Sequence, residues 1–95
     1  MTMHYDVKSA YTASDVAMVT YPVRIKGAYV SAATGGSSPV TFYDNASAAS
    51  GTVLLKIGVT AAGSHTVVIP GEGIRALNGV FCDTGSADAV TIFYG

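Results

Sequence analysis

The length, composition and charge of this chain already narrow its function. Its 95 residues are enough for one domain, and only 12% of them are Asp, Glu, Lys or Arg, against about 25% in an ordinary soluble domain. The net charge of −1 excludes the basic surface that nucleic acid or an anionic membrane would require. We therefore expect neither partner, and we expect neighbouring molecules to cover part of so weakly charged a surface.

Residues 1–21 form the least regular part of the sequence. Apolar side chains alternate there only over short stretches, which predicts a loose arm or edge strands. Tyrosine is favoured at interfaces because it joins a large apolar ring to a polar tip. The tyrosines and one methionine of this segment give the first part of a candidate interface: Tyr5, Tyr11, Met18 and Tyr21. Two interpretations stay open, in which the segment lies on another chain or folds back as an edge strand of its own domain.

Regular alternation predicts the first clear strand over residues 23–30. Arg24 and Lys26 lie on one face of this strand, and apolar residues alternate with them on the other. These two cations complete the candidate interface because they suit an acidic partner. Charged residues that keep a sheet edge soluble are the simpler explanation.

The next alternating runs predict strands over residues 40–43 and 53–59, with a polar loop between them. In the second run, four apolar residues share a core face: Val53, Leu55, Ile57 and Val59. A glycine-containing turn then leads into residues 65–69, so we expect a hairpin between that run and the one before it.

Turn residues divide the last third of the chain. Pro-Gly-Glu-Gly at 70–73 predicts a sharp turn. Asn78-Gly79 predicts a two-residue hairpin turn between the short runs on either side of it, because both positions tolerate positive φ. The last alternating run, residues 89–94, predicts a paired strand.

This pattern gives seven or eight short strands and no helix. Strands without helices bury both apolar faces only when two sheets pack together or one sheet closes on itself. The sequence therefore predicts an all-β, single-domain antiparallel β-sandwich with a jelly-roll-like strand order. The sandwich covers residues 22–95, and residues 1–21 precede it as an N-terminal arm or edge strands.

No group of residues specifies a reaction. Ser64 and His65 are adjacent, but neighbours on a strand point to opposite faces and do not share a proton readily, so we expect an exposed histidine. His4 and Cys82 have no partner at the spacing of a zinc site, and Cys82 is expected to be a small core residue. The acids that flank Thr-Gly-Ser-Ala are expected to cap that turn: Asp83 and Asp88. The chain is thus predicted to be no enzyme and to use no metal, cofactor or small-molecule substrate.

Location is predicted from what the sequence lacks. Residues 1–10 have no apolar run of the kind found in a signal peptide, and no stretch approaches the roughly 18 apolar residues that cross a bilayer. The single cysteine fits a reducing compartment. We therefore expect assembly in a cytoplasm, without a membrane partner.

Four segments carry strand and turn signatures: VRIKGAYV (23–30), FYDNASAASGTVLLKI (42–57), VVIPGEGI (67–74) and VTIFYG (90–95). They comprise a basic first strand, an Asp-Asn-Ala-Ser loop that leads into Gly-Thr-Val-Leu-Leu, an Ile-Pro-Gly turn and a closing aromatic strand. In these features residues 22–95 resemble the small structural proteins of tailed-bacteriophage virions that decorate, or cement, the capsid. Residues 1–21 lack the pattern.

The resemblance implies a compact β-sandwich that binds the outer surface of the phage head between capsomers and reinforces the shell. Its partner would be the major capsid protein, and its location would be the virion surface after assembly in the host cytoplasm. The resemblance implies no catalytic residue. The composition agrees, because a homo-oligomer held in many copies against a shell hides much of its weakly charged surface.

A tail, fibre or adhesin module that binds the host surface is the alternative. A glycan-binding module would be expected to show aromatic residues beside polar ones at a loop end. The chain has no tryptophan, and its loops consist mostly of Ala, Ser, Thr and Gly, so sugar binding is less favoured. A small enzyme ranks third because no cluster of acid, base and nucleophile is found.

Overall fold

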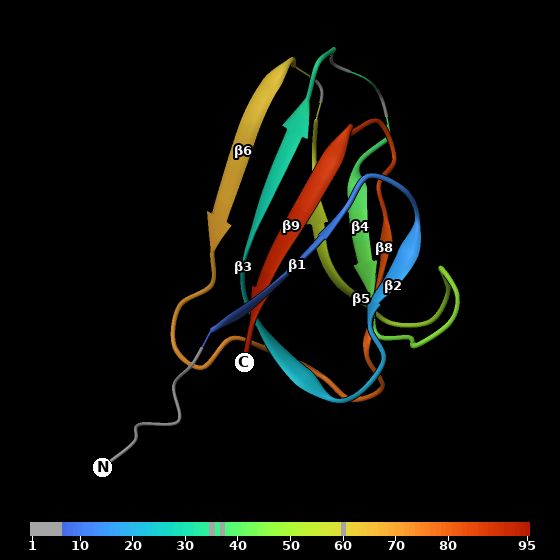
Figure 1. Cartoon of the computed structure of the whole chain (residues 1–95), viewed down its shortest axis with the longest axis vertical. Coiled ribbons are helices and arrows are strands. Elements are labelled where there is room, and N and C mark those ends of the chain that lie inside the picture. The colour runs from blue at the N-terminus through green and yellow to red at the C-terminus, as the bar shows by residue number, and fades with distance from the viewer. Residues whose placement is uncertain (1–6, 35, 37, 60) are drawn as a thin grey trace.

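The computed structural model describes residues 7–95 apart from positions 35, 37 and 60. Over these residues the chain forms nine β-strands in two antiparallel sheets and no helix, which confirms the predicted all-β sandwich (Figure 1). The strands are β1 (Lys8–Thr12), β2 (Val16–Val19), β3 (Val23–Ala32), β4 (Val40–Tyr43), β5 (Val53–Ile57), β6 (Gly63–Val68), β7 (Ile74–Ala76), β8 (Val80–Asp83) and β9 (Ala89–Tyr94).

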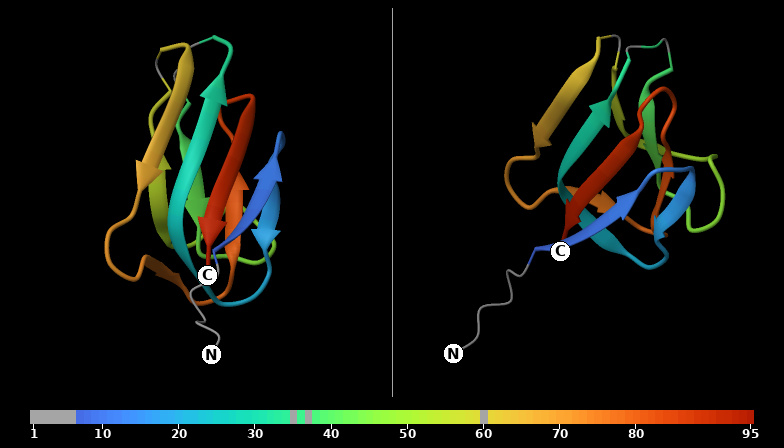
Figure 2. Two further views of the ribbon diagram at one scale, coloured as in Figure 1. Left: turned by 60° about the vertical axis from the view of Figure 1, so that its left-hand side comes forward. Right: turned by 45° about the horizontal axis from the view of Figure 1, so that its top comes forward.

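The strand order is that of a jelly roll. The first sheet, sheet A, has the order β1-β9-β3-β6, with the short β7 also paired to β3, and sheet B has the order β2-β8-β4-β5. The paired strands are therefore nested along the chain, with β4–β5 innermost and β1–β9 outermost, and successive pairs alternate between the sheets. This nesting is the double Greek key of a jelly roll. Figure 2 shows the two layers from two further sides.

Strands β6 and β7 together form one interrupted strand. Both run antiparallel to β3, one after the other. The five residues between them, 69–73, leave the ladder, and the Ile69 N–H donates to the Lys26 carbonyl oxygen (3.0 Å) where they do so. The return requires Gly73, because its φ is 91° and a Cβ there would collide with the carbonyl oxygen of Ile25. The predicted turn is thus an outward bulge within a strand.

Both hairpins predicted from local turn signals are wrong. β5 belongs to sheet B and β6 to sheet A, so the connection between them crosses from one sheet to the other. Asn78-Gly79 likewise joins β7 of sheet A to β8 of sheet B. Glycine is needed at position 79 because a Cβ there would collide with the carbonyl oxygen of Val19. Alternating apolar residues predict a strand, but the same alternation occurs in strands of either sheet and so does not predict which sheet the strand joins.

The hydrophobic core lies between the two sheets. Its largest fully buried side chains come from both of them and from one connection: Phe42, Ile25, Ile92, Val30, Val40, Val59, Val80, Val90 and Cys82. The predicted core row of β5 is wrong at Val53, which is 46% exposed. The ladder with β4 shifts between Phe42 and Tyr43, and this shift places Val53 opposite Tyr43, on the outer face.

The N-terminal strands form one edge of each sheet. β1 pairs with β9 along its whole length, and β2 pairs with β8. The described part of residues 1–21 therefore follows the second of the two interpretations, an edge of its own domain. Tyr5 and His4 lie outside the described residues.

Candidate functional site

The outer face of sheet A presents aromatic side chains close together. Val30, Val90 and Ile92 enter the core, so the residues that alternate with them point outward. The ladders place two outward rows across the strands, which are Tyr11, Thr91, Tyr29 and Thr66 in one and Ser9, Phe93, Gly27 and Val68 in the other. We call these eight residues the aromatic face.

The aromatic face is exposed and uncharged. Tyr11 is 69% exposed, Tyr29 40%, Phe93 37% and Val68 79%. The three rings surround Thr91, and Tyr11 and Tyr29 lie about 10 Å apart because neighbouring strands are about 4.8 Å apart. None of the eight residues is charged, so another surface can lie on this face without displacing tightly bound hydration water from ions.

The structure separates the tyrosines and methionine of the predicted interface. Tyr11 belongs to the aromatic face, whereas Met18 packs against the core. Tyr21 is half-exposed in the connection between β2 and β3, and its hydrogen bond with Tyr94 raises the pKa of Tyr94. Tyr5 lies outside the described residues.

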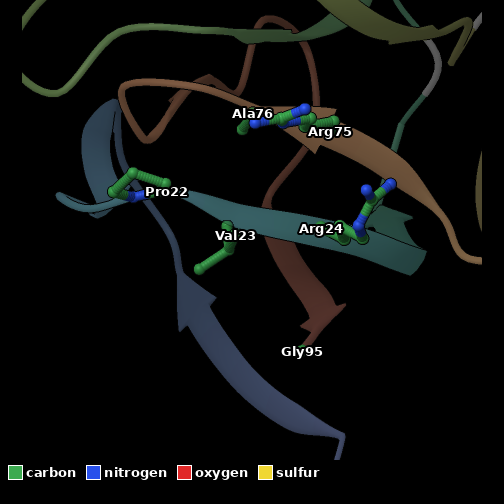
Figure 3. Close-up of a pocket in the computed structure, with 6 residues that line it drawn as sticks. All are labelled: Pro22, Val23, Arg24, Arg75, Ala76 and Gly95. Atoms are coloured by element: carbon green, nitrogen blue, oxygen red, sulfur yellow. The ribbon is translucent and has the colours of Figure 1, made fainter.

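The predicted cations, Arg24 and Lys26, lie at the beginning of β3, before the residues that this strand contributes to the aromatic face. Arg24 and Lys26 are half-buried on either side of Ile25. Arg24 lines a pocket of about 380 Å³ with Pro22, Val23, Arg75, Ala76 and Gly95 (Figure 3). The sequence alone did not single out Arg75, because only the pairing of β7 with β3 brings it beside Arg24.

The sequence alone also did not single out Tyr29, Phe93 and Val68. The outward direction of Phe93 and Val68 follows from their alternation with inward neighbours. Tyr29 points outward only because the register of β3 shifts between Ile25 and Gly27, which alternation alone does not predict. Their proximity to Tyr11 depends on the strand order of sheet A, which local patterns do not give.

Two residues fix the polar loop that follows β4. Asp44 accepts backbone hydrogen bonds from Asn78 (2.7 Å) and Leu77 (3.1 Å). These bonds hold the pKa of its carboxyl group below its ordinary value, and the bond from Asn78 has the largest effect. Asn45 accepts a hydrogen bond from the Ser47 N–H (2.9 Å). The Asp-Asn-Ala-Ser segment is therefore a structural loop whose polar groups are already engaged.

The two carboxylates that flank Thr-Gly-Ser-Ala have different partners. Asp83 accepts a hydrogen bond from the Gly85 N–H (3.0 Å), which confirms the predicted capping of that turn. The predicted capping by Asp88 is wrong, because its carboxylate accepts a hydrogen bond from the Ala33 N–H and so ties the residue before β9 to the end of β3. Among the residues that the structure describes, no group of three or more His, Cys, Asp or Glu side chains is placed to hold a metal ion.

His65 and Cys82 both face the interior. The predicted exposure of His65 is wrong, because position 65 lies opposite Val30 and its Nε2 atom is buried without a hydrogen-bond partner among the described residues. The hydroxyl of Ser64 belongs to the opposite face of β6. Cys82 is a buried core residue as predicted, and burial raises the pKa of its thiol to about 12.

Two surfaces therefore stand out on the described chain, the aromatic face and the pocket beside Arg24 and Arg75. Both suit binding, since neither brings an acid, a base and a nucleophile together. The described residues include no helix that is long and apolar enough to span a bilayer. Comparison with protein-family models, with curated protein sequences and with solved structures finds no match to this chain.

Proposed function

We propose that this chain is a phage capsid decoration protein, which binds the outer surface of the head between capsomers and stabilises the shell. The observation that carries this proposal is the aromatic face, an exposed and uncharged sheet surface. Its partner is the major capsid protein, and its role is structural and without catalysis. The jelly roll is compatible with this role because viral capsid domains use it, although a fold by itself assigns no function.

Docking of the aromatic face buries rings that water now covers. Full burial of a large apolar side chain contributes about 1.5–3 kcal/mol. Tyr11, Tyr29 and Phe93 are only partly exposed, so the burial of each ring on docking contributes part of that amount. The tyrosine hydroxyls and Thr91 offer hydrogen bonds at the same surface. Each contact is modest, but an oligomer that engages several shell subunits at once gains avidity.

The proposal includes self-association along β6. This strand forms an outer edge of sheet A and contains no charged residue and no proline (Figure 1). Lys8 on β1 and Lys56 on β5 are charges of the kind that keep sheet edges from pairing, and the pairing of β2 with β8 is irregular. A second copy can add its own β6 in antiparallel fashion, because the two-fold arrangement opposes no like charges.

A second candidate is a tail, fibre or adhesin module that binds host glycans. Aromatic rings stack against the apolar faces of sugars, and Thr91 and Thr66 lie beside the rings. The loop composition that counted against sugar binding does not bear on a sheet face. This candidate ranks second because the aromatic face has no carboxylate or amide side chain to select a sugar through paired hydrogen bonds.

Co-sedimentation with heads of the encoding phage that lack this chain tests both candidates. Tyr29→Ser removes a ring from the aromatic face, and Tyr43→Ser on the outer face of sheet B is the matched control. We expect the unmodified chain and Tyr43→Ser to bind heads, and Tyr29→Ser to lose about tenfold in affinity, the equivalent of about 1.4 kcal/mol. Binding to cells or glycans without binding to heads would favour the second candidate. Equal binding by both variants would rule out the aromatic face as the contact.

A further inference from the structure

Two arginines face each other across the pairing of β3 with β7. Arg24 and Arg75 are directly opposite in the ladder. We propose that this pair binds an oxyanion, a carboxylate or a phosphate group, in the pocket that they line. The inference does not depend on the proposed function, because it rests on strand register and charge at the far end of the sheet.

The hydrogen bonds of Arg24 fix how close the two side chains come. Its N–H donates to the Gly95 carbonyl oxygen (3.1 Å), and its own carbonyl oxygen accepts from the Gly95 N–H (3.0 Å). The backbone polar groups of Arg24 are therefore directed away from β7. Facing residues in such a non-hydrogen-bonded pair have Cα atoms only about 4.5 Å apart, closer than in a hydrogen-bonded pair.

Both arginines point to the same, outer side of the sheet. Ile25 and Ala76 are fully buried, so the residues next to them in the strands, Arg24 and Arg75, are directed outward. The pocket of about 380 Å³ lies beside them, and Figure 3 shows their two side chains on neighbouring strands, with Gly95 on the next strand. A ligand in this pocket can therefore reach both guanidinium groups.

The pairing of β3 with β7 sets two positive charges directly opposite each other. Like charges directly opposite in an antiparallel pair are destabilising. None of the side-chain hydrogen bonds found among the described residues uses an arginine or a lysine. Lys26 adds a third positive charge nearby on β3, and Glu72, on the bulge before β7, is the neighbouring acid. An oxyanion between the two guanidinium groups offsets their repulsion and accepts charge-assisted hydrogen bonds from both.

The bulge at residues 69–73 places the second arginine. It moves the chain out of the ladder after β6 and returns it as β7, in register with the beginning of β3. Gly73 makes this return possible because only glycine fits against the carbonyl oxygen of Ile25. The interruption that separates β7 from β6 is thus the feature that sets Arg75 opposite Arg24.

Thermal unfolding of the full chain with added anions tests the site. Sodium phosphate and sodium acetate are titrated separately and compared with sodium chloride at the same ionic strength, so that charge screening is equal. We expect one of the two oxyanions to raise Tm above the chloride value, and the larger rise identifies phosphate or carboxylate as the preferred group. Arg24→Gln and Arg75→Gln should each abolish the difference, whereas Lys56→Gln on sheet B should keep it.

NMR of the unmodified chain gives a second readout that does not depend on the variants. The side-chain Nε–H signals of Arg24 and Arg75 should shift together as the preferred anion is added. Equal Tm values in all three salts without such shifts would overturn the proposal. A rise in Tm that persists in both glutamine variants would also overturn it, because the anion would then bind elsewhere.

Discussion

Asp15 and Thr84 join the N-terminal edge of the sandwich to its interior strands. The Asp15 carboxylate accepts hydrogen bonds from the Thr84 N–H (2.9 Å) and from the Thr84 hydroxyl (2.8 Å). These bonds tie the turn between β1 and β2 to the turn after β8. The N-terminal strands are therefore held in the domain by side-chain contacts as well as by their ladders.

Asp15→Ala is expected to lower the free energy of unfolding by about 1–3 kcal/mol, because it leaves the buried Thr84 side chain and its N–H without their acceptor. Urea denaturation measures the loss. Thr84→Val removes the hydroxyl from the same contact, so the double variant should lose less than the two single losses added together. Additive losses would show that the two residues do not stabilise the fold through each other.

The lowered pKa of Asp44 predicts a pH-dependent contribution to stability. Its backbone hydrogen bonds favour the ionised form in the folded state, so the contribution is complete above the ordinary pKa of 3.8 and is lost as pH falls through the lowered value. We expect Asp44→Asn to have a lower free energy of unfolding than the unmodified chain near neutral pH, and this difference, the gap between the two chains, should narrow below pH 3.8. Denaturation curves across that range measure it. A gap independent of pH would contradict the assignment.

Burial of Cys82 predicts an unreactive thiol. With a pKa of about 12 and no exposed surface, the side chain forms little thiolate at neutral pH and offers no access to a reagent. A thiol-specific reagent should label the native chain only at the rate at which the chain unfolds, and labelling should become fast in urea. Rapid labelling of the native protein would contradict this.

The buried, unpartnered nitrogen of His65 predicts that an apolar residue at this position does not lower the stability of the fold. His65→Leu removes an unpartnered Nε2 atom from a position opposite Val30 and should leave Tm unchanged or raise it. The expected gain in the free energy of unfolding is at most about 1 kcal/mol. His65→Gln keeps a polar group there and serves as the control, with a lower expected Tm. A loss of stability with leucine would mean that the imidazole has a partner in the protein.

Self-association along β6 predicts sensitivity to one added charge. Ser64→Lys places a cation on this edge strand, on the same side as Thr66, and it should shift sedimentation-velocity profiles towards the monomer. Ala48→Lys adds the same charge to the exposed loop after β4 and should have no effect. If the unmodified chain is monomeric at high concentration, self-association along β6 is wrong.

Local patterns were enough to predict the strands. In Ala89–Tyr94, buried Val90 and Ile92 alternate with more exposed residues, as expected for a strand with one face in the core. In Val23–Ala32 the alternation is broken, because the register shifts between Ile25 and Gly27 and places Ala28 and Val30 in the core. The sheet that each strand joins could not be predicted in the same way. The chain bends at Asn78 as it leaves β7, but the strand that follows joins the other sheet. A bulge has a similar effect at Val53, where one extra residue turns a predicted core side chain outward.

The candidate sites depend even more on strand order. Arg24 could be identified as an outward cation, whereas its partner Arg75 comes from a strand that reaches it only after a bulge. Tyr11 could be identified as an unburied aromatic residue, whereas Tyr29 and Phe93 join it only because β9 lies between β1 and β3. Residues distant in sequence therefore complete both surfaces.

A cryo-EM map of phage heads prepared with this chain present tests the role of the aromatic face most directly. We predict density for the sandwich between capsomers, with sheet A against the shell, Thr91 and its surrounding rings buried there, and sheet B facing solvent. A map in which the rings of sheet A face solvent, or heads that carry no density for the chain, would contradict it.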